Sequence, residues 1–287
     1  MYADFDLIAP NSLQEALDAL GSDKTGAVPL AGGTNVLLDV RSRRIAPEHL
    51  LDLSRIGGLR GITVADGRVS LGARTTVSDL MASPEIARIA PALAEAARIF
   101  AGQMVRNAAT VAGNVACGSP AADLVPPLLS LDAEVALTSL RGTRQLALAD
   151  YYLGYKSDRR EPDELITAIS WPVPTPNTHG GFYKLARRKG DAITVVGVAV
   201  SIGVGATGCE WARIALGSVG PTPVRAIRAE NLLLGGPLTQ DKIAAAARAA
   251  AEDCSPIDDV RATGDYRRHM VSVLVARMVN RAVEANS

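Results

Sequence analysis

The apolar positions of the first 60 residues follow a helical spacing in one segment and form short strand-like runs in two others. In "NSLQEALDAL" (11–20) leucines and alanines recur at helical spacing, and Ser12 with Glu15 gives the S-x-x-E pattern of a helix N-terminus. The runs "AVPLA" (27–31) and "HLLDL" (49–53) have the length of strands. We therefore predict a small mixed unit at the start of the chain.

Two predicted hairpins enclose a helical block in the next section. Alternating apolar residues surround a Gly-containing turn at 66–67 and again at 141–142, which is the pattern of a β-hairpin. Between them, Ser83-Pro84 supplies a helix cap and a first-turn proline, and the helical spacing continues to Ala97.

A nearly charge-free stretch from Phe100 to Pro120 follows this block and is predicted to be a loop. Ser119-Pro120 predicts the start of a short helix, with Asp123 in its first turn. An acid at that position commonly serves the helix dipole, which is one explanation for Asp123.

Pro and Gly cluster at 171–181 and indicate a domain boundary. Three strand-like runs follow, at 181–187, 192–204 and 210–219, and two helices beginning after Thr239 and near Asp265 complete the pattern. The order is α+β and lacks a regular βαβ alternation. We predict a first domain over 1–175, in lobes of about 1–57 and 58–175, and a smaller α+β C-terminal domain over 176–287.

One motif in the C-terminal section is misleading. Residues 203–208, "GVGATG", match G-x-G-x-x-G letter for letter. A dinucleotide-binding motif needs those glycines to open a helix inside a βαβ unit, whereas here a strand-like run follows. We predict a glycine-rich hairpin turn.

Composition and charge exclude several classes of function. Lys+Arg and Asp+Glu both number 30, so nothing favours a polyanionic partner, and aromatics at 4% are too few for a base-stacking surface. A long uncharged run, 192–209, is β-branched and broken by glycines, which is typical of strands and not of a membrane helix. The acidic start lacks the pattern of a signal peptide, and we expect a soluble, cytoplasmic protein.

The three cysteines, Cys117, Cys209 and Cys254, are widely separated and form no C-x-x-C pair. An all-cysteine iron–sulfur cluster takes four cysteinates, so this chain alone cannot hold one. The three histidines are also scattered, and no metal-ligand spacing is present. We predict no metal site in this chain.

The candidate chemistry lies in two stretches of small residues. "PLAGGTNVLL" (29–38) places a Gly-Gly pair between two apolar runs, and "TVAGN" (110–114) is similar in character. Such glycines serve either a sharp turn or a backbone that binds phosphate through its N–H groups. The residues alone leave both explanations open.

Three segments together resemble one family: "AGGTNVLLDVR" (31–41), "FAGQMVRNAATVAGNVACGSPAADLVPPLLSLDAEV" (100–135) and "FYKLARRKGDAITVVGVAV" (182–200). They look like the FAD-binding (medium) subunit of the molybdenum hydroxylases, such as aerobic carbon-monoxide dehydrogenase and bacterial xanthine dehydrogenase. The resemblance runs in order from about Phe5 to the C-terminal helix. It implies the two-lobed FAD-binding fold of that family, followed by its C-terminal domain.

The resemblance also implies a set of FAD-binding residues. The two small-residue stretches would face each other across the FAD pyrophosphate, Asp123 would hold polar groups of FAD, and Ile193 would lie over one flavin face. Phe100 would pack near the cofactor, and Ile166 and Lys184 would line the flavin end. The complete set is Leu30, Ala31, Gly32, Gly33, Thr34, Asn35, Phe100, Thr110, Val111, Ala112, Gly113, Asn114, Asp123, Ile166, Lys184 and Ile193.

The chain departs from the family pattern at Ala112, where the family usually has glycine. We expect Ala112 to have a negative φ with its methyl group turned away from the phosphate.

The function implied by the resemblance is electron transfer within a larger enzyme. A molybdopterin large subunit would oxidise the substrate, and [2Fe–2S] centres on a small subunit would pass electrons to FAD on this chain, within a dimer of heterotrimers. No residue here is assigned a catalytic role. The alternatives are a self-contained FAD-dependent oxidase and a scaffold protein that has lost FAD. The substrate and the electron acceptor are not predicted.

Overall fold

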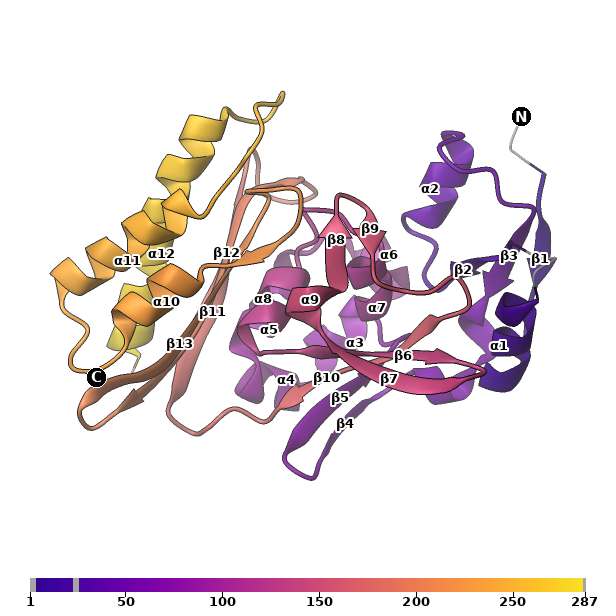
Figure 1. Ribbon diagram of the computed structural model, residues 1–287, viewed down its shortest axis with the longest axis horizontal. Helices are drawn as coiled ribbons and strands as arrows, with labels where there is room; N and C mark the ends of the chain where they lie inside the picture. Colours follow the sequence, from indigo (N-terminus) through magenta and orange to yellow (C-terminus); the bar gives the residue numbers. More distant parts are fainter. Residues whose placement is uncertain (1–3, 23–25, 286–287) are drawn as a thin grey trace.

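The computed structural model describes residues 4–22 and 26–285, and Figure 1 shows them as an elongated molecule with the N-terminal unit at one end and helices α10–α12 at the other. The three larger sheets succeed one another along the long axis, with helices between and outside them. The predicted α+β fold is confirmed.

The N-terminal unit is a small parallel sheet in the order β1-β3-β2. Ser12 caps the first helix, as predicted, by accepting the Glu15 N–H at 3.1 Å. The apolar face of that helix packs over the sheet in a core of its own, which includes Leu17 and Leu51. The elements are β1 (Asp6–Ile8), α1 (Leu13–Gly21), β2 (Val28–Leu30), α2 (Val36–Arg41), β3 (His49–Asp52) and two 3-10 turns, η1 (Leu53–Arg55) and η2 (Gly57–Leu59).

The central unit is an antiparallel sheet in the order β4-β5-β10-β6-β7. Both predicted hairpins are confirmed, as β4–β5 and β6–β7, and β10 returns from far along the chain to lie between them. The strands are β4 (Ile62–Ala65), β5 (Arg68–Gly72), β6 (Glu134–Ser139), β7 (Gly142–Ala147) and β10 (Leu165–Pro172); a short pair, β8 (Tyr152–Gly154) and β9 (Ser157–Asp158), lies beside them.

Seven short helices accompany the central sheet: α3 (Val77–Ala82), α4 (Pro84–Ile89), α5 (Pro91–Ile99), α6 (Gln103–Ala108), α7 (Val111–Ala116), α8 (Val125–Ser130) and α9 (Leu148–Tyr151). The predicted helix from Ser83 to Ala97 is two helices, α4 and α5. It breaks at Ala90 because Pro91 disfavours a helical conformation in the residue before it.

The stretch from Phe100 to Pro120 was predicted to be a loop, and this prediction is wrong. It contains α6 and α7, whose small residues form helices between tight turns. The predicted helix start at Pro120 is also wrong, since residues 119–124 form turns and α8 begins at Val125. Pro126 and Pro127 lack N–H groups and fit only the first turn of a helix, so they fix its start. Asp123 therefore precedes the helix.

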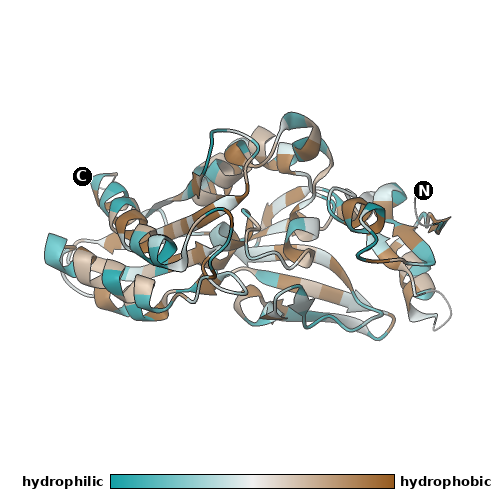
Figure 2. Ribbon diagram, turned by 90° about the horizontal axis from the view of Figure 1, so that it is seen from above, coloured by the Kyte–Doolittle hydropathy of each residue, from teal (hydrophilic) through white to brown (hydrophobic). Residues whose placement is uncertain are grey.

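The C-terminal unit is a sheet in the order β11-β12-β13-β14, made of β11 (Thr178–Ala186), β12 (Thr194–Gly205), β13 (Gly208–Gly217) and β14 (Val224–Arg225). Helices α10 (Ile227–Leu233), α11 (Gln240–Glu252) and α12 (Gly264–Glu284) cover one face, and α5 and α8 cover the other (Figure 1). Figure 2 shows hydrophobic colouring on strands between the layers and hydrophilic colouring on outer turns of the helices near the C-terminus.

The side-chain alternation of this sheet explains its two covered faces. Phe182, Ala199 and Ala215 point into the core of the central unit, while neighbours such as Val198 and Ile214 pack under the C-terminal helices. The sheet thus contributes to two hydrophobic cores.

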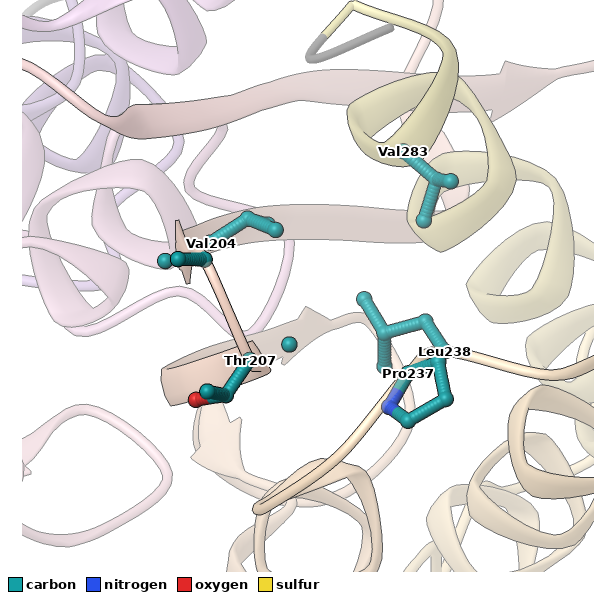
Figure 3. A pocket seen from close by; sticks show the side chains of 8 residues that line it. Val204, Thr207, Pro237, Leu238 and Val283 are labelled. Carbon is teal, nitrogen blue, oxygen red and sulfur yellow. The ribbon is translucent and has the colours of Figure 1, made fainter.

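The prediction that 203–208 forms a hairpin turn is confirmed, because Gly205 pairs with Gly208 across the β12–β13 turn. A shallow cavity of about 370 Å³ lies between this turn and Pro237, Leu238 and Val283 (Figure 3). Its lining is mostly apolar, and no helix begins at the turn.

Candidate functional site

The Gly-Gly stretch is the turn from β2 into α2. No acceptor within residues 4–22 and 26–285 receives the backbone N–H groups of the five consecutive residues from Gly32 to Val36. The turn is partly exposed, so these donors are accessible to a ligand. A run of accessible N–H donors at a helix start attracts an anion such as phosphate.

Glycine is required at the two positions of the turn for different physical reasons. A Cβ on Gly32 would collide with the carbonyl oxygen of Ala108, so Gly32 permits close contact with the end of α6. Gly33 has a φ of 71°, a left-handed conformation that side chains disfavour. The first of the explanations left open by the sequence therefore applies, since the chain turns sharply here, and the free donors are compatible with the second.

The second stretch, 110–114, begins α7. Thr110 caps this helix by accepting the Gly113 N–H at 3.0 Å, and the Val111 N–H donates to the Thr75 carbonyl at 2.9 Å. Ala112 has helical backbone and a buried side chain, so the expectation of a negative φ is confirmed. Because Gly32 lies against Ala108 and its Cβ position is 3.1 Å from the Ala109 Cα, the structure brings the first turn next to the start of the second stretch.

Phe100 is partly buried against the core of the central unit, at the end of α5. Arg106 holds the chain around it, donating from Nη1 to the carbonyls of Phe100 at 2.9 Å and Ala101 at 2.7 Å. The sequence analysis did not single out Arg106, although it is the only charged residue between Phe100 and Pro120.

Asp123 lies in the turn before α8 and is only 8% exposed. Its carboxylate accepts from Lys184 Nζ at 2.6 Å and from the Thr194 hydroxyl. The helix-dipole explanation for Asp123 is wrong, since the carboxylate pairs with two groups of the C-terminal sheet. Lys184 was expected at the flavin end and is equally buried, whereas Thr194 was missed.

The remaining two predicted residues differ in exposure. Ile166 lies in β10, is buried in the core of the central unit, and sits at a β-bulge opposite β6. Ile193 is 55% exposed and directly precedes Thr194 at the start of β12. Of the two, only Ile193 presents an apolar side chain to solvent.

A basic segment joins β11 to β12. Arg187, Arg188 and Lys189 are exposed there, and together with Ile99 and Tyr183 they line a shallow cavity of about 470 Å³ that also includes Lys184. The Arg187 guanidinium donates to the Val260 carbonyl at 2.8 Å, which ties this segment to the loop before α12.

A salt bridge joins α2 to the turn between β8 and β9. Asp39 accepts from Lys156 at 3.0 Å and from Arg44 at 3.2 Å. Burial would raise the pKa of the Asp39 carboxyl, but its bonds to these two cations outweigh burial and hold the pKa below its usual value. Gly118 lies directly against Lys156, so α2, this turn and the end of α7 meet at one place.

The cysteines are free thiols in different surroundings. Burial raises the pKa of Cys117 and Cys209 above the ordinary value and that of Cys254 to about 12. All three are therefore protonated at neutral pH, unlike the thiolates that ligate clusters.

These observations fit a phosphate-bearing cofactor. The free N–H groups of the first turn complement phosphate charge, and the nearby start of α7 adds a helix N-terminus. Asp123 and Lys184 supply a buried polar pair. FAD, which carries a pyrophosphate and a polar flavin edge, matches this donor set.

Two family models match the chain over most of its length. The FAD binding domain in molybdopterin dehydrogenase matches residues 3–174, and the CO dehydrogenase flavoprotein C-terminal domain matches residues 181–282. The chain belongs to the family of FAD-binding subunits of molybdopterin dehydrogenases, and its cofactor is FAD.

Individual relatives are similar over nearly their whole length. The carbon monoxide dehydrogenase medium chain of Hydrogenophaga pseudoflava is 35% identical over 97% of this chain and 96% of its own. The putative xanthine dehydrogenase FAD-binding subunit XdhB of Escherichia coli K12 is 32% identical over 96% and 94%. The predicted resemblance is thereby confirmed, and the chain is a flavoprotein subunit of an oxidoreductase.

Solved structures have the same fold. A chain of carbon monoxide dehydrogenase from Hydrogenophaga pseudoflava superposes with a TM-score of 0.95 at 35% identity, covering 99% of both chains. A chain of quinoline 2-oxidoreductase from Pseudomonas putida 86 gives 0.93 at 30% identity, covering 100% of this chain and 99% of that one. Every helix in the described part of our chain is too short or too polar to cross a bilayer.

Proposed function

We propose that this chain is the electron-transfer subunit of a multi-subunit molybdenum hydroxylase. Electrons from [2Fe–2S] centres on a partner would reach an external acceptor through the FAD held here. The observation that carries the proposal is the run of five acceptor-free N–H groups from Gly32 to Val36, next to the start of α7. FAD supplies the chemistry of accepting and releasing electrons singly or in pairs.

Each part of the site has a proposed role toward FAD. Leu30–Asn35 would hold the pyrophosphate mainly through the free backbone N–H groups of its turn, which would offset the phosphate charge without arginines. Thr110–Asn114 would lie beside it and add the N–H of Ala112, since the other N–H groups of α7's first turn have acceptors within the protein. Asp123 and Lys184 hold polar groups, and Phe100 and Ile166 pack near the cofactor. Ile193, exposed at the start of β12, limits access to it.

The partners follow from what this chain lacks. With three cysteines it cannot ligate an all-cysteine cluster, so iron–sulfur centres in the electron path would lie on another protein. We propose an iron–sulfur small subunit and a molybdopterin large subunit, assembled as a dimer of heterotrimers in the cytoplasm. Within this chain we propose that 1–175 is the FAD-binding domain, in lobes 1–57 and 58–175, and that 176–287 is the C-terminal domain.

The isolated chain should bind FAD but show no substrate turnover. Purified alone, it should carry about one FAD and accept electrons from a chemical reductant. Co-expression with the two partner subunits should restore substrate oxidation coupled to flavin reduction.

Two outcomes would contradict this proposal. A single chain that oxidised a substrate at an enzyme-like rate would support a self-contained FAD oxidase. A folded chain that bound no FAD under titration would support a scaffold protein.

A further inference from the structure

Arg267 is a buried arginine on α12, far along the chain from the residues expected to bind FAD. It is 3% exposed, and its guanidinium donates to three acceptors. Nη1 donates to the carbonyls of Val195 at 2.8 Å and Ser218 at 3.0 Å, and Nη2 donates to Asp259 at 2.7 Å. A buried guanidinium with three fixed partners holds those partners in one arrangement.

The two carbonyls that Arg267 holds belong to the ends of neighbouring strands. Val195 is the second residue of β12, and Ser218 directly follows β13. Ser218 has a φ of 63°, an unfavourable conformation for a residue with a side chain, which must be imposed by its surroundings. Arg267 therefore joins two strand ends where the backbone is bent.

Both strand ends also contact the segment that contains Asp123. The Ser218 N–H donates to the Pro120 carbonyl at 2.8 Å. Thr194, the neighbour of Val195, donates its hydroxyl to the Asp123 carboxylate. One carbonyl that Arg267 holds belongs to Ser218, which contacts Pro120, and the other belongs to Val195, the neighbour of Thr194, which contacts Asp123.

Asp259 anchors the arginine from the loop before α12. Its carboxylate also accepts the backbone N–H of Arg261 at 2.8 Å and of Ala262 at 3.3 Å, so the loop is closed around it. The guanidinium is therefore fixed on one side by this loop and on the other by the strand ends.

We propose that Arg267 is a positioning residue of the FAD site. It holds the start of β12 and the end of β13 so that Thr194 and Ser218 keep the Pro120–Asp123 segment in place. The proposal rests on the assignment of Asp123 to FAD in the proposed function, but its first consequence concerns the protein without cofactor.

The first test is hydrogen exchange in the FAD-free chain. In Arg267→Met the Ser218 amide, which Pro120 protects, should exchange at least about tenfold faster than in the wild type, because its carbonyl loses the guanidinium. Arg225→Met is the matched control. Arg225 is also ion-paired, with a side chain that is 12% exposed, and it joins β14 to the Leu129 carbonyl in α8. It should leave Ser218 exchange near the wild-type rate.

The second test measures FAD binding by titration into each apo-protein. Arg267→Met should raise the FAD dissociation constant by at least about tenfold, Arg267→Lys should fall between it and the wild type, and Arg225→Met should stay within about twofold. Arg267→Lys also retains a buried cation should the methionine variant fail to fold.

The results separate this proposal from the proposed function. Unchanged Ser218 exchange in both Arg267 variants would overturn the positioning role, whether or not FAD binds. Equal effects of Arg225→Met and Arg267→Met on exchange and affinity would reduce Arg267 to a general stabilising residue. If the wild type failed to bind FAD and Ser218 still exchanged fast in Arg267→Met, the proposed FAD-binding function would be contradicted. The role of Arg267 in holding the two strand ends would stand.

Discussion

At the scale of single residues, Gly33 offers a clean test of the phosphate-binding turn. Gly33 and Gly67 share the same φ of 71°, but Gly67 is in the exposed β4–β5 turn with nothing near its Cβ position. Alanine at either position should cost about 1–2 kcal/mol through the left-handed backbone. At Gly33 the added Cβ would also lie 3.0 Å from the Leu37 side chain, so the cost there should be somewhat larger. Only Gly33→Ala should also weaken FAD binding, since a shifted turn misaligns its free N–H groups.

Calorimetric titration of FAD into both apo-variants measures this difference. Two variants that both stay folded, with a dissociation constant raised only in Gly33→Ala, would support the turn as the phosphate site. Equal FAD affinities in the two variants would assign Gly33 to chain geometry alone.

A second residue-scale prediction concerns Asp123 and Lys184. Replacing Asp123 by Asn leaves the Lys184 ammonium buried without its counter-ion, which should cost about 3–5 kcal/mol of stability. The double variant Asp123→Asn/Lys184→Met removes that penalty and should recover most of the stability. If the pair binds FAD, both variants should bind it at least about tenfold more weakly.

Denaturant unfolding of the apo-proteins and FAD titration check the two parts separately. A double variant with wild-type FAD affinity would make the ion pair purely structural.

At the scale of elements, the sequence predicted what local patterns determine. The two hairpins, the Ser12 cap and the β12–β13 turn are encoded by neighbouring residues, and all are confirmed. Prolines 126–127 also encode the start of α8, but the prediction rested on Ser119-Pro120 alone and placed the helix too early. Residue types therefore predicted most elements and misplaced boundaries where two signals competed.

The candidate site was only partly accessible from sequence for a different reason. Asp123 was singled out, but its partner Thr194 lies 71 positions away and is placed by the pairing of β11 with β12. The contact of Gly32 with Ala108 likewise depends on how two units pack. The spacing of residues along the sequence cannot predict contacts between distant segments. Lys184 was predicted only from the resemblance to the family.

An element-scale prediction concerns the segment between β11 and β12. Under the proposed function, Ile193 should affect electron release to the acceptor more than substrate oxidation, because its exposed side chain would limit access to FAD while the substrate would be oxidised on another subunit. Ile193→Ala should change the rate of flavin reoxidation severalfold. Ile257→Ala is the control, since Ile257 is 71% exposed on a different loop.

Stopped-flow measurement of the two half-reactions in the assembled enzyme decides this point. Equal changes in both half-reactions, or an equal effect of Ile257→Ala, would count against the placement of Ile193.

At the scale of the whole molecule, the shared C-terminal sheet should make unfolding a single transition. Phe182, Ala199 and Ala215 lie in one core and their neighbours in the other, so neither core can open without disturbing the sheet. The fluorescence of the two tryptophans reports on different parts of the molecule, because Trp171 is buried in the central core and Trp211 lies on β13.

Unfolding followed by fluorescence in Trp211→Phe reports on the central core through Trp171. The same measurement in Trp171→Phe reports on the C-terminal sheet through Trp211. The change in fluorescence of each variant should coincide with its own loss of helical circular dichroism. A fluorescence transition separated from the circular dichroism transition in either variant would show that the two units unfold independently.

The shared sheet also sets an order of events during synthesis. The face of α5 and α8 that it covers is translated first, and the covering strands begin only at Thr178, well after α8 ends at Ser130, with α12 last. A nascent chain that has not reached β11 exposes an apolar face, and chaperones and proteases act on such surfaces. Because Lys184, Thr194 and Arg267 all follow Asp123 along the chain, we expect FAD to be inserted only after the ribosome has released the protein.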